Sequence, residues 1–292
     1  MFLATLRAGA ARLRSIEERC KKIQEALGRI EGRQLGDLPA SEIHKSEFRV
    51  FSQWGEDGIL QHLLRHITIS RRMFVEFGVE NYTESNTRYL LMKDNWAGLV
   101  IDGDTKNIDF IKNEDVYWRY NLKADTAFIT RENINDLIRR NGISGEIGLL
   151  SVDIDGNDYW VWEALDIVSP SIVIVEYNAR FGLKRAVTVP YDPSFVRTTA
   201  HHSNIYYGAS IAALCLLGKR KGYSLVGCNS AGNNAFFVRE ELRPINLPKL
   251  TPAEGFVRSQ FRESRDAGGA LAHLSEVQEE AILDKLPLVE VS

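Results

Sequence analysis

Residues 73–86 read MFVEFGVENYTESN, a short apolar run followed by a glycine and a polar stretch. Similar apolar runs recur as GLVID at 98–102, IGLLSVD at 147–153 and SIVIVEY at 171–177. Each run carries an acidic residue at or near its C-terminal end. Strands that are covered on both faces are apolar at nearly every position, so these runs predict a parallel sheet between two layers of helices.

Segments with helical spacing separate the runs, at 84–94, 131–141 and 159–165, and VYWRY at 116–120 is a weaker strand candidate. The last two apolar runs, SLVGC and AFFVR, are joined by NSAGNN, whose Asn and Gly residues suit a tight reversal. We therefore predict an α/β fold of the Rossmann-like, doubly wound kind, with a mostly parallel sheet that ends in an antiparallel hairpin.

The composition of the 292 residues, 44% hydrophobic and 26% charged, excludes a wholly disordered or fibrous chain. A formal net charge of -3 gives no bulk attraction to nucleic acid or to an anionic membrane. The three cysteines, Cys20, Cys215 and Cys228, form no CxxC pair, so we expect a reducing, cytoplasmic setting. No apolar stretch approaches the ~20 residues of a spanning helix, and we expect no transmembrane segment.

The first 35 residues have the pattern of a coiled-coil helix, with apolar residues that alternate three and four apart from Leu13 onward. The first core position of the heptad holds Leu6, Leu13, Cys20 and Leu27, and the second holds Gly9, Ile16, Ile23 and Ile30. Leucine followed by isoleucine in this order favours three or four parallel helices. We predict a homo-oligomer, a trimer or tetramer, through residues 6–30. The alternatives are a helix packed on its own domain and a helix that lies on a membrane surface.

The chain is accordingly divided into a helix at 1–35, a linker at 36–47, a globular domain at 48–240 and a C-terminal tail at 241–292. The tail has three prolines in its first part and then one or two polar helical segments. We assign it no chemistry and expect it to be loosely attached.

Polar residues follow the first two strands, where ligands of open parallel sheets bind. Behind the first strand come Glu76, Gly78, Asn81, Thr83 and Ser85. The second strand ends in IDGD, where Asp102 or Asp104 is spaced to accept hydrogen bonds from a ribose. There is no GxGxxG and no Walker lysine, so diphosphate binding is not supported. The two strand ends predict a nucleoside-type cofactor, and the alternative is that these residues only cap helices and form turns.

These segments, with LLSVDIDGNDYW, IVIVEYN and the closing hairpin, resemble a class I S-adenosylmethionine-dependent methyltransferase of the FkbM-like branch, over about residues 48–240. The resemblance implies a seven-stranded sheet and S-adenosyl-L-methionine as the cofactor. It places Glu76 and Gly78 in the cofactor loop, and Asp102 with Gly103 at the ribose. FSQWGEDG at 51–58 resembles a segment that folds over the cofactor, which adds Gln53. The usual GxG spacing of the first loop is absent here.

Carboxylates gather behind the fourth and fifth strands. SVDIDGNDYW contains Asp153, Asp155 and Asp158, and the following strand ends in Glu176 and Asn178. Carboxylates this close repel one another unless a cation or hydrogen-bond donors neutralise them. Hard oxygen ligands suit Mg²⁺ or another divalent cation, so we predict a metal site of Asp153, Glu176 and Asn178. The alternative is that Asp155 caps the next helix and Asp153 accepts backbone N–H groups.

The long segment 178–210 is irregular, as lids and binding loops often are. It contains the adjacent pair His201 and His202, and histidine titrates near neutral pH. We predict that one of them removes the proton of a substrate hydroxyl, with Asp155 as a further catalytic candidate. The aromatic residues of the loop offer apolar faces for sugar C–H groups, namely Tyr191, Phe195, Tyr206 and Tyr207.

We therefore predict an S-adenosylmethionine-dependent O-methyltransferase that acts on a hydroxyl of a sugar, glycan or similar small polar acceptor, with or without a divalent metal. Asp153 and either Glu176 or Asn178 position that acceptor. One alternative is a metal-dependent glycosyltransferase that uses a nucleotide sugar, because DGD at 102–104 and DID at 153–155 match the short acidic motif of such enzymes. The other alternative is a non-catalytic coiled-coil scaffold.

Overall fold

The computed structural model describes residues 2–292, except for the side chains of residues 2–8, 10 and 14. The strands of its main sheet are β1 Met73–Phe77, β2 Ala97–Asp102, β3 Leu122–Thr126, β4 Gly145–Val152, β5 Val168–Glu176, β7 Tyr223–Cys228 and β8 Asn234–Arg239. They lie in the order β3-β2-β1-β4-β5-β8-β7. The first five strands are parallel, and β8 is antiparallel to both β5 and β7. The predicted doubly wound sheet with an antiparallel hairpin is confirmed.

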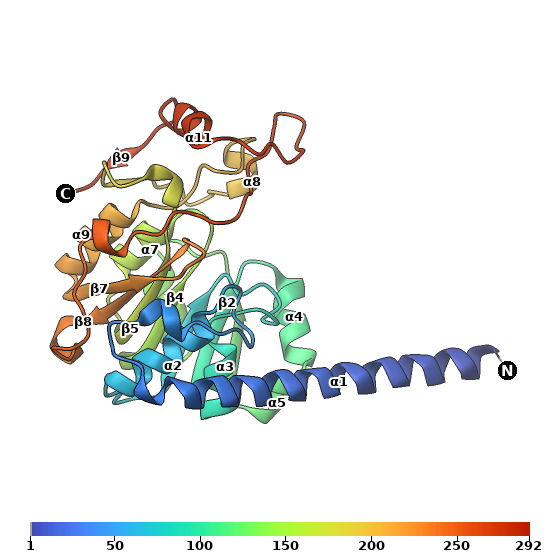
Figure 1. Cartoon of the computed structure of the whole chain (residues 1–292). Helices are drawn as coiled ribbons and strands as arrows, with labels where there is room; N and C mark the ends of the chain where they lie inside the picture. The colour runs from blue at the N-terminus through green and yellow to red at the C-terminus, as the bar shows by residue number, and fades with distance from the viewer. Residues whose placement is uncertain (1) are drawn as a thin grey trace.

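The helices cover both faces of this sheet (Figure 1). Their bounds are α1 Phe2–Gln34, α2 Glu56–His66, α3 Arg88–Asp94, α4 Thr105–Asn113, α5 Asp115–Arg119, α6 Ile134–Arg140, α7 Asp158–Ala164, α8 Arg197–Ala200, α9 Ile211–Arg220, α10 Pro252–Gly255 and α11 Glu276–Leu283. Four short 3-10 helices connect them, η1 Leu35–Asp37, η2 Ile43–Ser46, η3 Ala179–Phe181 and η4 Glu240–Leu242. In the part of the chain that the structure describes, no helix has the length and apolar character to cross a membrane.

Two apolar layers explain why the strands are apolar throughout. Successive side chains of a strand point to opposite faces, so Val75 and Phe77 pack beneath α6, α7 and α9, while Phe74 packs beneath α2, α3 and α4. Trp162 of α7 is fully buried against Phe237. It packs in the core of the domain.

The third strand is the one element of the sheet that the sequence pattern misplaces. VYWRY forms most of α5, and the strand is the next segment, LKADT. β3 lies at the edge of the sheet and alternates buried with exposed positions, so it lacks the continuous apolar run of the inner strands. The helix begins at Asp115, which forms an ion pair with Arg119 one turn later at 2.6 Å.

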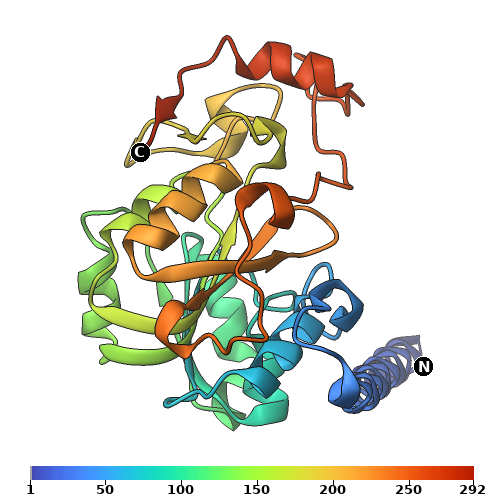
Figure 2. The ribbon, with the colours of Figure 1, turned by 60° about the vertical axis from the view of Figure 1, so that its left-hand side comes forward.

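The C-terminal tail is attached to the domain at several points, contrary to the predicted loose attachment. Its last strand, β9 Val289–Glu290, pairs with β6 Val187–Thr188. The backbone N–H of Gln260 donates to the carbonyl of Ala231, in the loop that joins β7 to β8, at 2.8 Å. The tail thus runs back across the carboxyl ends of the strands and ends beside the 178–210 segment (Figures 1 and 2).

Candidate active site

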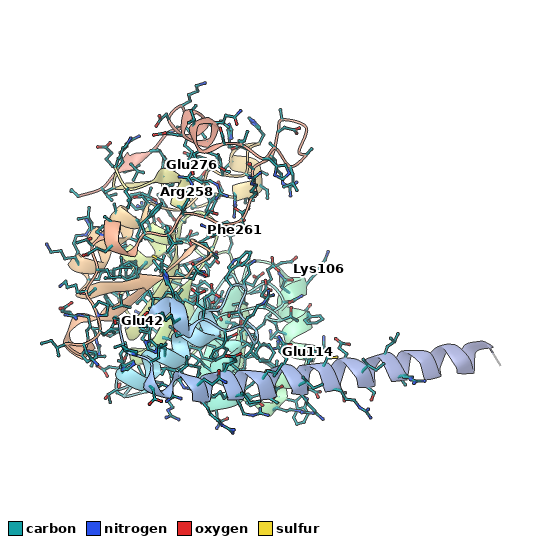
Figure 3. The ribbon with its side chains drawn as sticks, viewed as in Figure 1. Glu42, Lys106, Glu114, Arg258, Phe261 and Glu276 are labelled. Carbon is teal, nitrogen blue, oxygen red and sulfur yellow. The ribbon has the colours of Figure 1, made fainter. Side chains whose placement is uncertain are left out.

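A cavity of about 460 Å³ opens beyond the carboxyl ends of β1, β2, β4 and β5. Between β1 and β4 the strand order changes direction, and this is where doubly wound sheets bind ligands. The tail contributes Phe261 and Glu263 to its lining. In Figure 3, Phe261 lies on the C-terminal segment, on the side of the molecule toward Lys106 of α4.

Glu76, at the end of β1, holds the first loop of the cavity in place. Its Oε1 accepts from the N–H of Asn86 at 2.8 Å, and its Oε2 accepts from the N–H and hydroxyl of Thr87. Burial raises the pKa of Glu76 to about 7, although these hydrogen bonds lower it. Gly78 has φ +68°, and a Cβ there would lie 1.7 Å from the carbonyl oxygen of Asp153, so only glycine lets the loop approach β4.

The predicted residues of this loop divide into two groups. Ser85 lines the cavity together with Glu76 and Gly78. Asn81 and Thr83 do not, because the Asn81 side chain accepts from the N–H and hydroxyl of Thr83 in an exposed turn of its own. The loop also places Glu80, Glu84 and Asn86 at the cavity, residues that the sequence did not single out.

Asp102 at the end of β2 lines the cavity and is nearly buried. Its Oδ2 accepts from the N–H of Glu80 at 2.8 Å, and its Oδ1 accepts from Asp104 N–H and Asn107 Nδ2 at 2.8 and 3.0 Å. A carboxylate has about four acceptor positions, so one position on Oδ2 is left for a ligand hydroxyl. Gly103 lines the cavity beside it, whereas Asp104 caps α4 through the N–H of Lys106.

The segment before α2 supplies Gln53 to the cavity. Asp57 fixes this segment, since its Oδ2 accepts from three successive N–H groups, Val50 to Ser52, at 2.7 to 2.8 Å. Burial raises the pKa of Asp57 to about 6 despite these bonds. Next to Gln53, the ring of Trp54 stacks on Phe261 of the tail, with centroids 5.1 Å apart and planes 15° from parallel.

Three carboxylates meet at the ends of β4 and β5. Asp153, Asp155 and Glu176 each have an oxygen within 4.8 Å of the others. Burial raises the pKa of both Asp153 and Glu176 well above the usual range, and the charge of the neighbouring acids raises it further. Asp158 is not part of this cluster, because its oxygens accept from the N–H groups of Ile154 and Gly156.

A protein cation faces this cluster. Arg197 donates to Asp155 Oδ1 at 2.5 Å and to Glu263 of the tail, and its guanidinium lies 3.7 Å from the centre of the Tyr207 ring. Its charge lowers the pKa of Asp153 and Glu176 and so opposes the effect of burial. Asp155 thus forms an ion pair instead of the helix cap considered for it, and it lines the cavity.

Asn178 does not belong to the predicted metal site. Its Oδ1 accepts from the N–H of Arg180 at 3.1 Å, and its Nδ2 donates to the carbonyls of Ile205 and Tyr207 at 2.8 and 3.0 Å. Directly after β5 the chain turns into η3, which points this side chain toward the 205–207 loop and away from the carboxylates. Asp155 takes its place as the third member of the oxygen cluster.

His201 and His202 do not line the cavity. Their rings lie 4.2 Å apart just after α8, and His201 Nδ1 lies 2.6 Å from the hydroxyl oxygen of Ser203. Burial and the neighbouring His202 lower the pKa of His201. The 178–210 segment contributes Phe195 and Arg197 to the cavity instead.

Unpaired polar atoms mark the β4 and β5 side of the cavity. Asn157 Oδ1, Glu176 Oε2 and Asn234 Oδ1 are buried and have no hydrogen-bond partner among the residues that the structure describes. All three residues line the cavity. Buried polar atoms are nearly always paired in proteins, so this side of the cavity is built to accept hydrogen bonds from a polar ligand.

No family model and no curated protein matches the chain, but solved structures do. Several of these neighbours are methyltransferases. An S-adenosylmethionine-dependent methyltransferase from Clostridium acetobutylicum is 10% identical, with 63% of this chain and 89% of that chain covered and a TM-score of 0.40. An O-methyltransferase from Bacillus cereus in complex with SAH is 14% identical, with 57% and 72% covered and a TM-score of 0.33. At these values the likeness alone establishes neither the family nor the activity of this chain.

Proposed function

We propose that the chain is an S-adenosylmethionine-dependent O-methyltransferase that acts on a hydroxyl group of a sugar, glycan or similar small polar acceptor. One observation carries the proposal: a single cavity at the switch point of the sheet joins Asp102 to the half-buried Asp153 and the buried Glu176. Its volume is in the range of pockets that hold small-molecule ligands. The FkbM-like branch, to which the sequence motifs point, is part of this proposal.

The β1 and β2 side of the cavity fits the donor. Asp102 has a free acceptor position for a ribose hydroxyl, and Gly78 and Gly103 leave the backbone open to a ligand. When bound, S-adenosyl-L-methionine supplies a methyl group on a positively charged sulfur. Gln53 of the preceding segment faces the same space.

The β4 and β5 side fits the acceptor. Two carboxyl groups this close, one buried and one half-buried, do not both ionise easily, because the charge of each raises the pKa of the other. The ionised carboxylate accepts the proton of the acceptor hydroxyl. At the same time the hydroxyl oxygen of the acceptor forms a bond to the methyl carbon, and the bond between that carbon and the sulfur breaks. The amide oxygens of Asn157 and Asn234 accept from further hydroxyls, and Phe261, which stacks on Trp54 and lines the cavity, offers apolar surface to a sugar ring.

The donor site is tested by calorimetry with S-adenosylhomocysteine. Asp102→Ala is expected to weaken binding about 10-fold or more, because a hydrogen bond to a charged group contributes about 1.5–3 kcal/mol. Asp104→Ala is the matched control, since it removes a carboxylate two residues away that caps α4 and does not line the cavity. Equal affinity in the two variants, or binding of a nucleoside diphosphate with Mn²⁺ in place of S-adenosylhomocysteine, would contradict the proposal.

We also propose that the reaction needs no divalent metal. Arg197 already supplies a positive charge at Asp155, so a cation held by Asp153, Asp155 and Glu176 would have to displace it. Neither Mg²⁺ nor EDTA is expected to shift the Tm by more than about 1 °C, because a ligand stabilises only the state that it binds. A Tm that rises with Mg²⁺ concentration, and falls again with EDTA, is the result that would restore the metal site.

A further inference from the structure

The apolar stripe of α1 faces solvent. The described side chains at the two core positions of the heptad are 49 to 69% exposed, namely Leu13, Ile16, Ile23, Leu27 and Ile30, and Cys20 is exposed with them. The Leu6 side chain lies outside the described residues. The N-terminal half of the helix extends well beyond the rest of the molecule (Figures 1 and 2), so this stripe is open to a partner.

A different face of α1 packs on its own domain, and it does so through glycine. Gly28 lies against Val50 and Tyr89, where an added Cβ would be 2.3 Å from a Val50 methyl carbon. The Gln24 side chain donates to the carbonyl of Val50, and Arg65 of α2 donates to the carbonyl of Gly32. The domain therefore packs against the glycine side of the helix, and the leucine and isoleucine side chains of the stripe stay exposed to solvent.

Charges beside the stripe favour one orientation of identical helices. The position before the first core residue holds Arg12 and Arg19, and the position after the second holds Glu17 and Glu31. In a parallel pair in register, Arg12 of one helix faces Glu17 of the other. In an antiparallel pair, each of these positions faces the same position of the other helix, so the contact between Arg12 and Glu17 is not made. The helix is thus complementary to parallel copies of itself.

We propose that residues 13–30 of α1 bind the same residues of further copies of this chain, in a parallel, in-register coiled coil of three or four helices. The proposal does not depend on the proposed function. Leucine at the first core position and isoleucine at the second set the number of helices. The mixed charges beside the stripe suit helices better than an anionic membrane surface, which would be met by basic residues alone.

Light scattering of the full chain tests the association. The wild type is expected at three to four times the chain mass of 33.0 kDa. Ile16→Lys with Ile23→Lys is expected to reduce the mass to that of one chain, because it buries two charges in each helix seam. Ala11→Lys with Ser15→Lys adds the same charges to exposed positions off the stripe and should leave the mass unchanged. The proposal would be overturned if the wild type had the mass of one chain, or if the variant with Ile16→Lys and Ile23→Lys stayed assembled. If the wild type were a monomer and bound to anionic vesicles, the stripe would be assigned to a membrane surface.

Disulfide trapping with diamide tests the orientation. Leu13→Cys in a Cys20→Ser background is expected to form a covalent dimer on a non-reducing gel, since residues 13 of parallel helices in register lie side by side. In an antiparallel pair, residue 13 would face the region of residue 30, about 25 Å from its own copy at 1.5 Å per residue. Cys20→Ser alone is the background control, because Cys215 and Cys228 are partly or fully buried. Trapping only when Leu13→Cys and Ile30→Cys chains are mixed would overturn the parallel arrangement.

Discussion

Glu176→Gln is expected to lower methyl transfer by about 10²- to 10⁴-fold, the range that general acid–base catalysis contributes. Glutamine keeps the size of the side chain, but its amide cannot take up the proton of an acceptor hydroxyl. The affinity for S-adenosylhomocysteine should stay within about threefold, because Glu176 lies at the end of β5 and the proposed ribose site lies at the end of β2. The measurement is transfer of labelled methyl groups from S-adenosylmethionine to a panel of monosaccharides and glycosides.

Glu163→Gln is the matched control for this experiment. Glu163 belongs to α7, is exposed and pairs with Arg220 at 2.9 Å, so the same chemical change occurs away from the cavity. Its activity should equal that of the wild type. If Glu176→Gln retained full activity with a wild-type pH profile, the carboxyl pair would not be the base, and the proposed mechanism would be wrong even if the donor site held.

The pH dependence of the wild type follows from the same pair. Because burial raises the pKa of Asp153 and Glu176, the pair keeps a proton to higher pH than free carboxyl groups do. The base form therefore increases as pH rises, and kcat should rise with pH through this raised pKa. In Glu176→Gln the rising limb should disappear or move to lower pH, since Asp153 then titrates without the charge of Glu176 beside it.

Local patterns were enough to predict the framework of the site. Continuous apolar runs located β1, β2, β4 and β5, and the residues at their carboxyl ends are fixed by the strand that precedes them. Asp102, Asp153 and Glu176 therefore meet in one cavity as their positions in the sequence indicated. The edge strand β3 was missed because its buried positions alternate with an exposed and then half-buried polar residues, which give no continuous apolar run.

Side chains from irregular segments were harder to predict, because their direction depends on contacts between parts of the chain that are far apart in sequence. His201 and His202 had suitable chemistry, but α8 turns them away from the cavity and brings Arg197 to it. Phe261 and Glu263 meet Trp54 and Arg197 only because the tail folds back over the sheet. Neither periodicity nor spacing marks such contacts, although the length of the 178–210 segment did indicate a binding loop.

Arg197→Met is expected to lower the rate at pH 7 by about 10- to 100-fold and to move the pH profile to higher pH. The Arg197 charge lowers the pKa of Asp153 and Glu176, so its loss leaves burial and acid–acid repulsion unopposed and less of the pair is ionised at pH 7. The measurement is kcat against pH, with thermal unfolding to show that the variant is folded.

Arg197→Lys separates charge from shape in that experiment. Lysine keeps the positive charge near Asp155 but loses the forked contact that joins Asp155 to Glu263, so it should restore most of the pH profile without the full rate. A methionine variant with the wild-type pH profile would show that the guanidinium does not act on the carboxyl pair. A methionine variant that gains activity with Mg²⁺ would show that the three acids hold a cation once the arginine is gone, so that Arg197 takes the place of a metal in this cavity.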